Sequence, residues 1–276
     1  MPELVQLPAI ANAPLSVVLL AQHADAPVAE VVASWVARLD KLDREYEILL
    51  VFARHIDPEG TLAATLSAAH PPIRILCHPS RRGVGAALSA GIAAAQHPLL
   101  FYTECDRQYH GADLRQLLGE IDKVHLVSGF RKWQRAPGWV RWLGRIYRGL
   151  ARVLFGYPLE PLLGWLGWKE HAYRWLVRVL FGVRMSDVNC AFRLCRRDIF
   201  ARIPVQSDGP FVHVEILAKA NFLGFYMNDE VPVPYRPRIA GDTAAGEPSR
   251  LLADAYRVFS EADFGPPVLP EQSATG

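Results

Sequence analysis

The chain has 276 residues, of which 51% are hydrophobic and 21% are charged, a composition typical of a globular protein with a large core. The formal net charge is only +2, so we expect no nucleic acid partner. The cysteines Cys77, Cys105, Cys190 and Cys195 form no CxxC pair, and no histidine stands at zinc spacing, so we expect reduced thiols in a cytoplasmic compartment. The N-terminal segment lacks a basic region, so we expect no secretory signal. No uncharged apolar run reaches about 18 residues, so we predict no membrane-spanning helix.

The first half of the chain alternates short apolar runs with segments of helical spacing. We predict buried strands over residues 15–20, 45–52, 73–78, 99–103 and 125–131, and helices over residues 28–39, 61–70 and 85–96. The small residues of the third helix would allow close packing on a sheet. Strands that alternate with helices predict an α/β fold with a parallel sheet and helices on both faces, in which ligands bind outside the carboxyl ends of the strands.

Two acids follow the fourth predicted strand directly, in the stretch "LLFYTECDRQYHGADL". Glu104 and Asp106 are separated by one residue, and Gln108 follows. Carboxylates are hard oxygen ligands suited to Mg²⁺ or Mn²⁺. The alternative is an acidic turn that caps the helix around Leu114. Ligands of α/β sheets bind outside the carboxyl ends of the strands, so the position of these acids after a strand favours a ligand site over a helix cap.

Two glycines open the third predicted helix. Gly83 and Gly85 follow Arg81 and Arg82 in the stretch "HPSRRGVGAALSAG". Backbone N–H groups at a helix start, together with guanidinium groups, can hold a phosphate. A tight strand-to-helix turn that needs glycine is an equally good interpretation.

Two later stretches hold further candidates. In "SDVNCAFRLCRR" (186–197), Asp187 and Arg193 are possible site residues, and the alternation of apolar residues is typical of a half-buried strand. In "SDGPFVHVEILAKA" (207–220), Glu215 stands in an apolar context and is a candidate for a shifted pKa, whereas a lone His213 is more often structural.

The middle of the chain is basic and contains a duplication. From Arg131 to Arg202 there are fifteen Lys or Arg residues and four Asp or Glu residues. "YRGLARVLFG" (147–156) and "YRWLVRVLFG" (173–182) match at eight of ten positions, and four arginines share one helical face: Arg141, Arg145, Arg148 and Arg152. We predict amphipathic helices over 137–184 that lie on an anionic membrane surface. The alternative is a helix packed on the domain with solvated arginines.

The last segment, residues 241–276, is rich in Ala, Gly, Pro and acids. It contains one helical pattern, "SRLLADAYRVF", at 249–259. We predict a partly disordered tail.

Six stretches together resemble the family 2 glycosyltransferases, and among them the polyprenyl-phosphate sugar transferases of the dolichol-phosphate mannose synthase type. They are "RRGVGAALSAG", "FYTECDRQY", "VSGFR", "SDVNCAFRLCRR", "FVHVEILAKANFLGF" and "VPVPYRPRIAGDT". The resemblance runs from about residue 15 to 243. It implies a family 2 domain over 1–240 with a GT-A type fold, in which a mostly parallel twisted sheet with a Rossmann-like nucleotide-binding half carries the amphipathic helical insertion.

The resemblance also implies roles for individual residues. It assigns the divalent ion, Mg²⁺ or Mn²⁺, to Glu104, Asp106 and Gln108. It assigns the nucleotide sugar donor to Glu104 and Asp106 and leaves Asp25 as the acid after the first strand, and the residue pattern adds Arg82 and Gly83. It assigns the acceptor phosphate to Arg131, Arg145 and Arg238. Together with the residue pattern, it makes Asp106, Arg131 and Glu215 the candidates for catalysis.

The chain departs from the family pattern at several places, one of them the end of the first strand, which reads "LLAQHADA" where the family has Pro-x-x-Asn-Glu. Glu104 stands where the family has Asp, and "LVFARHIDPEGT" has Phe52, Ala53, Arg54 and His55 where the family has two Asp residues that contact the nucleotide. One hypothesis is therefore a transferase that moves a hexose from a GDP- or UDP-sugar to a polyprenyl phosphate with inversion. The alternative is a degenerate member that binds lipid or protein without turnover, so enzymatic activity is left open. A nicotinamide-dependent enzyme is disfavoured, because no Gly-rich turn follows the first strand.

The expected partners are a nucleotide sugar, a polyprenyl phosphate lipid and a membrane surface. We therefore expect a cytoplasmic protein that is peripheral on the cytoplasmic face of a membrane.

Overall fold

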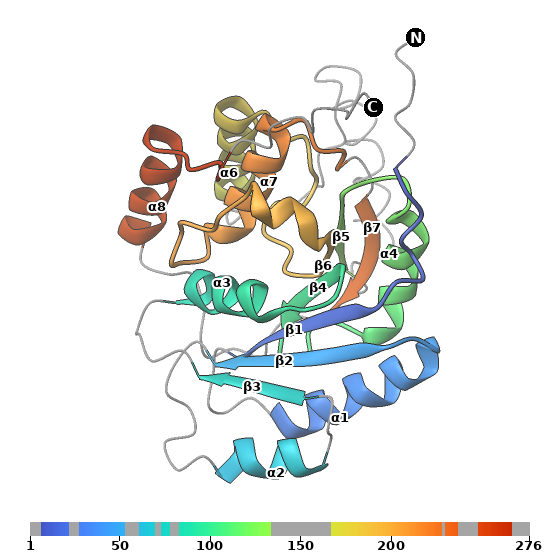
Figure 1. The fold of residues 1–276 in the computed structure, drawn as a ribbon. Coiled ribbons are helices and arrows are strands. Elements are labelled where there is room, and N and C mark those ends of the chain that lie inside the picture. The colour runs from blue at the N-terminus through green and yellow to red at the C-terminus, as the bar shows by residue number, and fades with distance from the viewer. Residues whose placement is uncertain are drawn as a thin grey trace, which may run out of the picture.

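A twisted sheet lies at the centre of the structure (Figure 1). The computed structural model describes residues 7–21, 28–52, 61–69, 73–77, 83–133, 167–227, 230–236 and 248–266. Within these ranges the sheet has seven strands: β1 (Leu15–Ala21), β2 (Tyr46–Phe52), β3 (Ile73–Cys77), β4 (Leu99–Glu104), β5 (Leu126–Trp133), β6 (Arg193–Arg196) and β7 (Glu230–Tyr235).

The strands lie in the order β3-β2-β1-β4-β6-β5-β7. β6 is antiparallel to both of its neighbours, and the other pairings are parallel. The carboxyl ends of β1, β2, β3, β4, β5 and β7 therefore meet at one edge of the sheet. This arrangement confirms the predicted α/β fold with a mostly parallel sheet.

Helices cover both faces of the sheet (Figure 1). They are α1 (Val28–Leu39), α2 (Thr61–Ala69), α3 (Val84–Ala94), α4 (Leu114–Glu120), α6 (Gly167–Phe181), α7 (Val212–Phe222) and α8 (Pro248–Ser260). Side chains that alternate along β1 separate into two cores. Val17 and Leu19 pack with residues of α1 and α4, whereas Val18 and Leu20 pack with residues of α3 and α7. The apolar runs without alternation thus mark strands that are buried on both faces.

Close packing of α3 on the sheet is confirmed at Gly91. A Cβ atom built there would lie 2.5 Å from Cγ1 of Val18 on β1. Any larger residue would push the helix away from the strand, which explains the glycine at this position.

Two strands differ from the sequence analysis. β7 was not predicted, because Pro232 and Pro234 argue against a strand. The strand forms because β7 is the edge strand, where a proline that cannot donate to a neighbour is tolerated. The half-buried strand expected around Phe192 is fully buried from Cys190 to Arg196, because β6 lies between β4 and β5 under helices on both faces.

The second copy of the duplication lies in α6, and the first copy, 147–156, falls outside the described residues. Among the described residues no helix is long and apolar enough to cross a membrane. The helical pattern of the tail is α8, which is packed: Val258 is buried and Phe259 contacts Phe181 edge-on. Partial disorder of the tail remains a prediction for 241–247 and 267–276, which the structure does not describe.

Candidate functional site

The two predicted acids lie at the carboxyl edge of the sheet, at the end of β4. Glu104 is paired with Leu20 of β1, and the Cys105 N–H still donates to the Leu20 carbonyl at 2.8 Å. The side chain of Cys105 is buried in the core, and Glu104 and Asp106 on either side of it are partly exposed. Alternation along the extended chain therefore directs both carboxyl-bearing residues away from the core.

A turn after β4 fixes the backbone of Gln108. Its N–H donates to the carbonyl of Asp106 and, at 3.2 Å, to the Asp106 carboxylate. Its carbonyl accepts a hydrogen bond of 3.1 Å from the N–H of Arg236, the residue after β7. Its side-chain Nε2 donates to the Tyr235 hydroxyl at 3.2 Å. Glu104, Asp106 and Gln108 are called the acidic edge below.

Arg131 of β5 lies next to the acidic edge and is paired with Asp187. Its Nε and Nη2 donate to the two carboxylate oxygens of Asp187 at 2.6 and 2.8 Å, and its backbone N–H donates at 3.2 Å. Burial would lower the pKa of Arg131, but the hydrogen bonds and charge of Asp187 raise it well above its ordinary value. Burial would raise the pKa of Asp187, but Arg131 lowers it below the ordinary value. Both groups are therefore ionised, and Asp187 orients the guanidinium.

The loop that carries Asp187 is held on two sides. The carboxylate of Glu230, the first residue of β7, accepts from the Ser186 N–H at 2.8 and 2.9 Å and from the Asp187 N–H at 3.2 Å. From α6, Nη1 of Arg174 donates to the Ser186 carbonyl at 2.7 Å. The position of the Arg131 side chain thus depends on β7 and α6 as well as on β5.

Tyr235, the last residue of β7, contacts both Gln108 and Arg131. The guanidinium carbon of Arg131 lies 5.2 Å from the centroid of its ring, within cation–π range. Burial raises the pKa of Tyr235, the charge and hydrogen bond of Arg131 lower it, and the charges of Asp106 and Glu104 raise it, with a net upward shift. The charges of both carboxylates and of Arg131 therefore act on the pKa of the Tyr235 hydroxyl. Sequence analysis missed this residue, although the stretch "VPVPYRPRIAGDT" contains it.

The side chains of the acidic edge fit a divalent ion that also takes phosphate ligands. Two carboxylates and an amide oxygen are hard donors, and Mg²⁺ is commonly held by one or two carboxylates together with substrate phosphates. In the part of the chain that the structure describes, no group of three His, Cys, Asp or Glu side chains could hold a metal ion.

The glycines before α3 have a structural reason. Gly83 has a φ of +153°, and a Cβ atom there would lie 2.6 Å from the Asp208 carbonyl oxygen. A Cβ atom on Gly85 would lie 2.1 Å from the carbonyl oxygen of Ser207. The N–H groups of Gly85 and Ala86 donate to the Asp208 carbonyl at 2.9 and 3.4 Å. These two amides are thus engaged within the protein, which favours the close-packed turn over a phosphate cradle.

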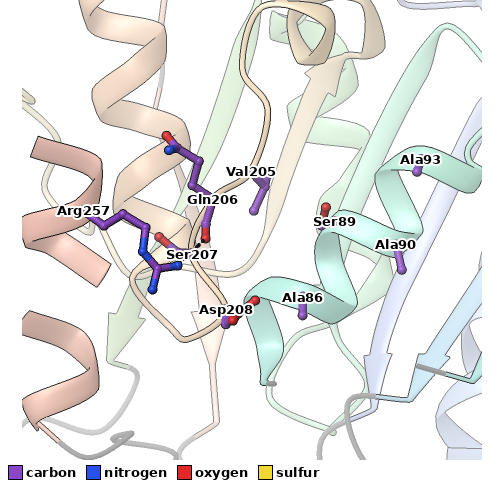
Figure 2. Close-up of a pocket in the computed structure, with 9 residues that line it drawn as sticks. All are labelled: Ala86, Ser89, Ala90, Ala93, Val205, Gln206, Ser207, Asp208 and Arg257. Atoms are coloured by element: carbon purple, nitrogen blue, oxygen red, sulfur yellow. Dashed lines mark hydrogen bonds between the residues drawn. The ribbon is translucent and has the colours of Figure 1, made fainter. Parts of the chain in front are cut away.

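A groove of about 410 Å³ lies between α3, the 205–208 loop and α8 (Figure 2). Its lining residues are Ala86, Ser89, Ala90, Ala93, Val205, Gln206, Ser207, Asp208 and Arg257. None of these belongs to the acidic edge. The groove is therefore separate from the site that the sequence predicts.

Glu215, a predicted catalytic residue, lies in the interior. Its carboxylate accepts hydrogen bonds from the N–H groups of Gln206 and Ser207 at 2.7 and 2.8 Å, and Nζ of the buried Lys219 lies 2.8 Å away. These contacts all belong to the 206–219 segment. The structure therefore gives Glu215 the contacts of a residue that holds the 206–207 loop, and it does not join Glu215 to Asp106 and Arg131.

Arg193 is a candidate from the stretch 186–197, and it is fully buried. Its guanidinium donates to the hydroxyls of Ser128 and Tyr102 and to the carbonyls of His213 and Val188. It connects β4, β5, β6 and α7 and is a structural residue.

Comparison with known proteins decides the family. The profile of Glycosyl transferase family 2 matches residues 16–203, which include the acidic edge, Arg131 and Asp187. The chain belongs to glycosyl transferase family 2.

Two relatives are uncharacterised glycosyltransferases of Mycobacterium tuberculosis and Mycobacterium bovis. Each is 31% identical over 102 residues, which are 37% of this chain and 44% of the relative. The chain thus spans less than half the length of the curated relatives that it matches.

Solved structures of a similar architecture support the fold. Glucosyl-3-phosphoglycerate synthase of M. tuberculosis is 18% identical, with a TM-score of 0.58 over 91% of this chain and 82% of that chain. The same synthase in complex with Mn²⁺, UDP and glucosyl-3-phosphoglycerate is 17% identical, with a TM-score of 0.57 over 91% and 81%. These similarities show that this family 2 protein has the GT-A fold.

Several residues that the family pattern predicts fall outside the described ranges. They are Asp25, Arg82, Arg145 and Arg238. Of the predicted site residues that are described, the structure brings together Glu104, Asp106, Gln108 and Arg131.

Proposed function

We propose that this family 2 protein transfers a hexose from a GDP- or UDP-sugar to a polyprenyl-phosphate-type acceptor with inversion. The observation that carries the proposal is the convergence on Tyr235. Gln108, in the turn after β4, and Arg131 of β5 lie more than twenty positions apart in sequence, and both contact its side chain at the carboxyl edge of the sheet. This edge is where α/β sheets bind their ligands.

The acidic edge would hold the donor. Glu104, Asp106 and the carboxamide oxygen of Gln108 would bind Mg²⁺ or Mn²⁺, and the ion, when bound, neutralises charge on the diphosphate leaving group. The synthase of M. tuberculosis has been solved with Mn²⁺ and UDP, which supports a divalent ion in a fold of this kind.

Arg131 would hold the acceptor phosphate. Its side chain is 25% exposed, and Asp187 holds the Nε and Nη2 groups, which orients the guanidinium for a second anion. In the transfer an acceptor phosphate oxygen forms the new bond to the anomeric carbon as the bond to the donor diphosphate breaks on the opposite face. Because the acceptor oxygen is already anionic, this step needs positioning and electrostatic stabilisation rather than a strong base.

A transfer assay tests the proposal. The protein is incubated with Mn²⁺ and radiolabelled UDP-glucose or GDP-mannose, with undecaprenyl phosphate in detergent or with 3-phosphoglycerate. We expect label in the lipid fraction. If only phosphoglycerate is labelled, the proposed lipid acceptor is wrong and phosphoglycerate takes its place. The synthase of M. tuberculosis has been solved with phosphoglyceric acid.

A second candidate is a member that binds nucleotide or lipid without turnover. The observation that favours it is the end of β2 at Phe52, followed by Ala53 and Arg54 where the family pattern has acids. Binding of a nucleotide sugar without transfer to either acceptor would favour this candidate.

The substitution Arg131→Lys separates acceptor binding from donor binding. Lysine cannot form the two-pronged contact with Asp187, so its ammonium is no longer aimed at the phosphate. The loss of one charge-assisted hydrogen bond, about 1.5–3 kcal/mol, corresponds to a fall in transfer of roughly 10- to 100-fold. We expect nucleotide affinity, measured by calorimetry, to stay nearly unchanged. An equal loss of transfer and of nucleotide affinity would place Arg131 in the donor site instead.

The exposed face of α6 would provide the predicted membrane contact. Trp175 and Val179 are 65% and 58% exposed, and Leu176 and Leu180 lie beside them. Arg178 lies within the same helix, and the exposed Arg184 follows its end. An apolar stripe flanked by arginines is suited to an anionic interface.

We therefore expect the protein to float with vesicles that contain anionic lipid at low salt and to be released as salt rises. The substitution Trp175→Ser should weaken this binding. Equal recovery with neutral and anionic vesicles would show that the arginines do not contribute.

A further inference from the structure

The Tyr235 hydroxyl lies between the two halves of the site. It accepts a hydrogen bond from Nε2 of Gln108 at 3.2 Å, and it is hydrogen-bonded to Arg131 on the other side. Arg131 has only donors, so the hydroxyl oxygen faces donors from both neighbours. Its lone pairs are thus committed to N–H groups.

This arrangement decides which end of the Gln108 carboxamide faces the tyrosine. A carboxamide has a donor end, Nε2, and an acceptor end, Oε1. Because Nε2 of Gln108 faces Tyr235, its Oε1 faces away from Tyr235. The backbone N–H of Gln108 is held by Asp106, and its carbonyl is held by Arg236. The residue is only 8% exposed, so its carboxamide has little space in which to rotate.

The aromatic ring of Tyr235 is itself held in place. The ring of Tyr109 lies 5.7 Å from it, and the Arg131 guanidinium lies 5.2 Å from its centroid. Asp187 fixes that guanidinium with two hydrogen bonds. The hydroxyl therefore has a defined position relative to Gln108.

We propose that Tyr235 is a positioning residue that keeps the carboxamide oxygen of Gln108 directed toward the divalent ion of the nucleotide-sugar site. The proposal rests on the proposed function, because it needs an ion at the acidic edge. A cation is bound by an amide oxygen and repelled by an amide NH₂ group, so an amide that turned over would remove a ligand and add a repulsive dipole.

The substitution Tyr235→Phe removes the hydroxyl and keeps the ring. We expect the affinity for Mn²⁺ in the presence of UDP, measured by electron paramagnetic resonance of free Mn²⁺, to fall about 10-fold, as is typical when a partner that orients a metal ligand is lost. The matched control is Tyr109→Phe. Its hydroxyl contacts Sγ of Cys190 at 3.6 Å, and its removal should leave Mn²⁺ affinity unchanged.

The Gln108→Glu background distinguishes orientation from general support. A carboxylate carries oxygen at both ends, so its rotation presents the ion with the same atom. In this background Tyr235→Phe should leave Mn²⁺ affinity unchanged or slightly higher. A loss of equal size in both backgrounds would overturn the positioning role.

The two proposals fail in different ways. If the unmodified chain binds Mn²⁺ with UDP and Tyr235→Phe binds it equally well, only the positioning role is overturned. If the unmodified chain binds no Mn²⁺ in the presence of any nucleotide tested, the proposed function is overturned and the positioning role with it.

Discussion

The substitution Asp106→Ala is expected to abolish metal-dependent binding of the nucleotide sugar while leaving the protein folded. Asp106 follows β4 at the carboxyl edge, it is partly exposed, and its side-chain hydrogen bond to the Gln108 N–H belongs to a local turn. Its removal takes away one of two carboxylates at the proposed ion site. We expect affinity in the presence of Mn²⁺ to fall by more than about 100-fold, beyond the usual loss when only an outer partner of a metal site is removed.

The control for this experiment is Asp198→Ala, which removes an exposed carboxylate at the start of a short 3₁₀ helix, Arg197–Ala201. It should not change Mn²⁺-dependent binding. Thermal unfolding of both variants should stay close to that of the unmodified chain, because neither carboxylate is buried in the core. Intact donor binding in Asp106→Ala would remove Asp106 from the site.

The substitution Arg193→Ala is expected to produce the largest loss of stability. Arg193 is fully buried, and its guanidinium satisfies two hydroxyls and two carbonyls from β4, β5, α7 and the loop before β6. Truncation leaves these groups without their donor and opens a cavity in the centre of the domain. We expect the free energy of unfolding to fall by about 3–5 kcal/mol, measured by urea denaturation.

Arg184→Ala provides the matched control, since Arg184 is exposed and lies in the same stretch of the chain. Its effect should stay within about 0.5 kcal/mol. A loss below about 1 kcal/mol in Arg193→Ala would show that water or a neighbouring side chain replaces the guanidinium, and the buried network would then not be a main contributor to stability.

The first part of the fold could be predicted from the sequence because its strands are buried on both faces. The apolar runs around Val17 and Leu50 have no polar face, so their length and spacing identify them directly. β7 could not be predicted in this way, because Pro232 and Pro234 are unfavourable in a strand unless it lies at the edge of the sheet. Its edge position is a property of the assembled sheet and is not visible in the local sequence.

The site shows the same division. The acidic edge could be predicted because Glu104, Asp106 and Gln108 lie within five residues after one strand. The partners that orient this site come from distant parts of the chain. Asp187 lies 56 positions after Arg131, and Tyr235 lies 127 positions after Gln108. Their roles depend on β7 lying beside β5, which only the sheet topology reveals.

Glu215 illustrates the opposite case, in which a local pattern was misleading. An acid among apolar residues indicates burial, and Glu215 is indeed buried. Its charge is balanced by Lys219 one helical turn later, and its oxygens accept two backbone N–H groups. The pattern thus identified the burial correctly, while the contacts point to a structural use of the carboxylate.

The most direct test of the central claim is calorimetric titration of the unmodified protein with UDP-glucose and GDP-mannose, with and without Mn²⁺. The convergence of Glu104, Asp106, Gln108 and Arg131 at one edge of the sheet predicts that at least one of these nucleotide sugars binds and that binding depends on Mn²⁺. Absence of binding for both sugars in the presence of Mn²⁺ would contradict the assignment of this edge as a nucleotide-sugar site.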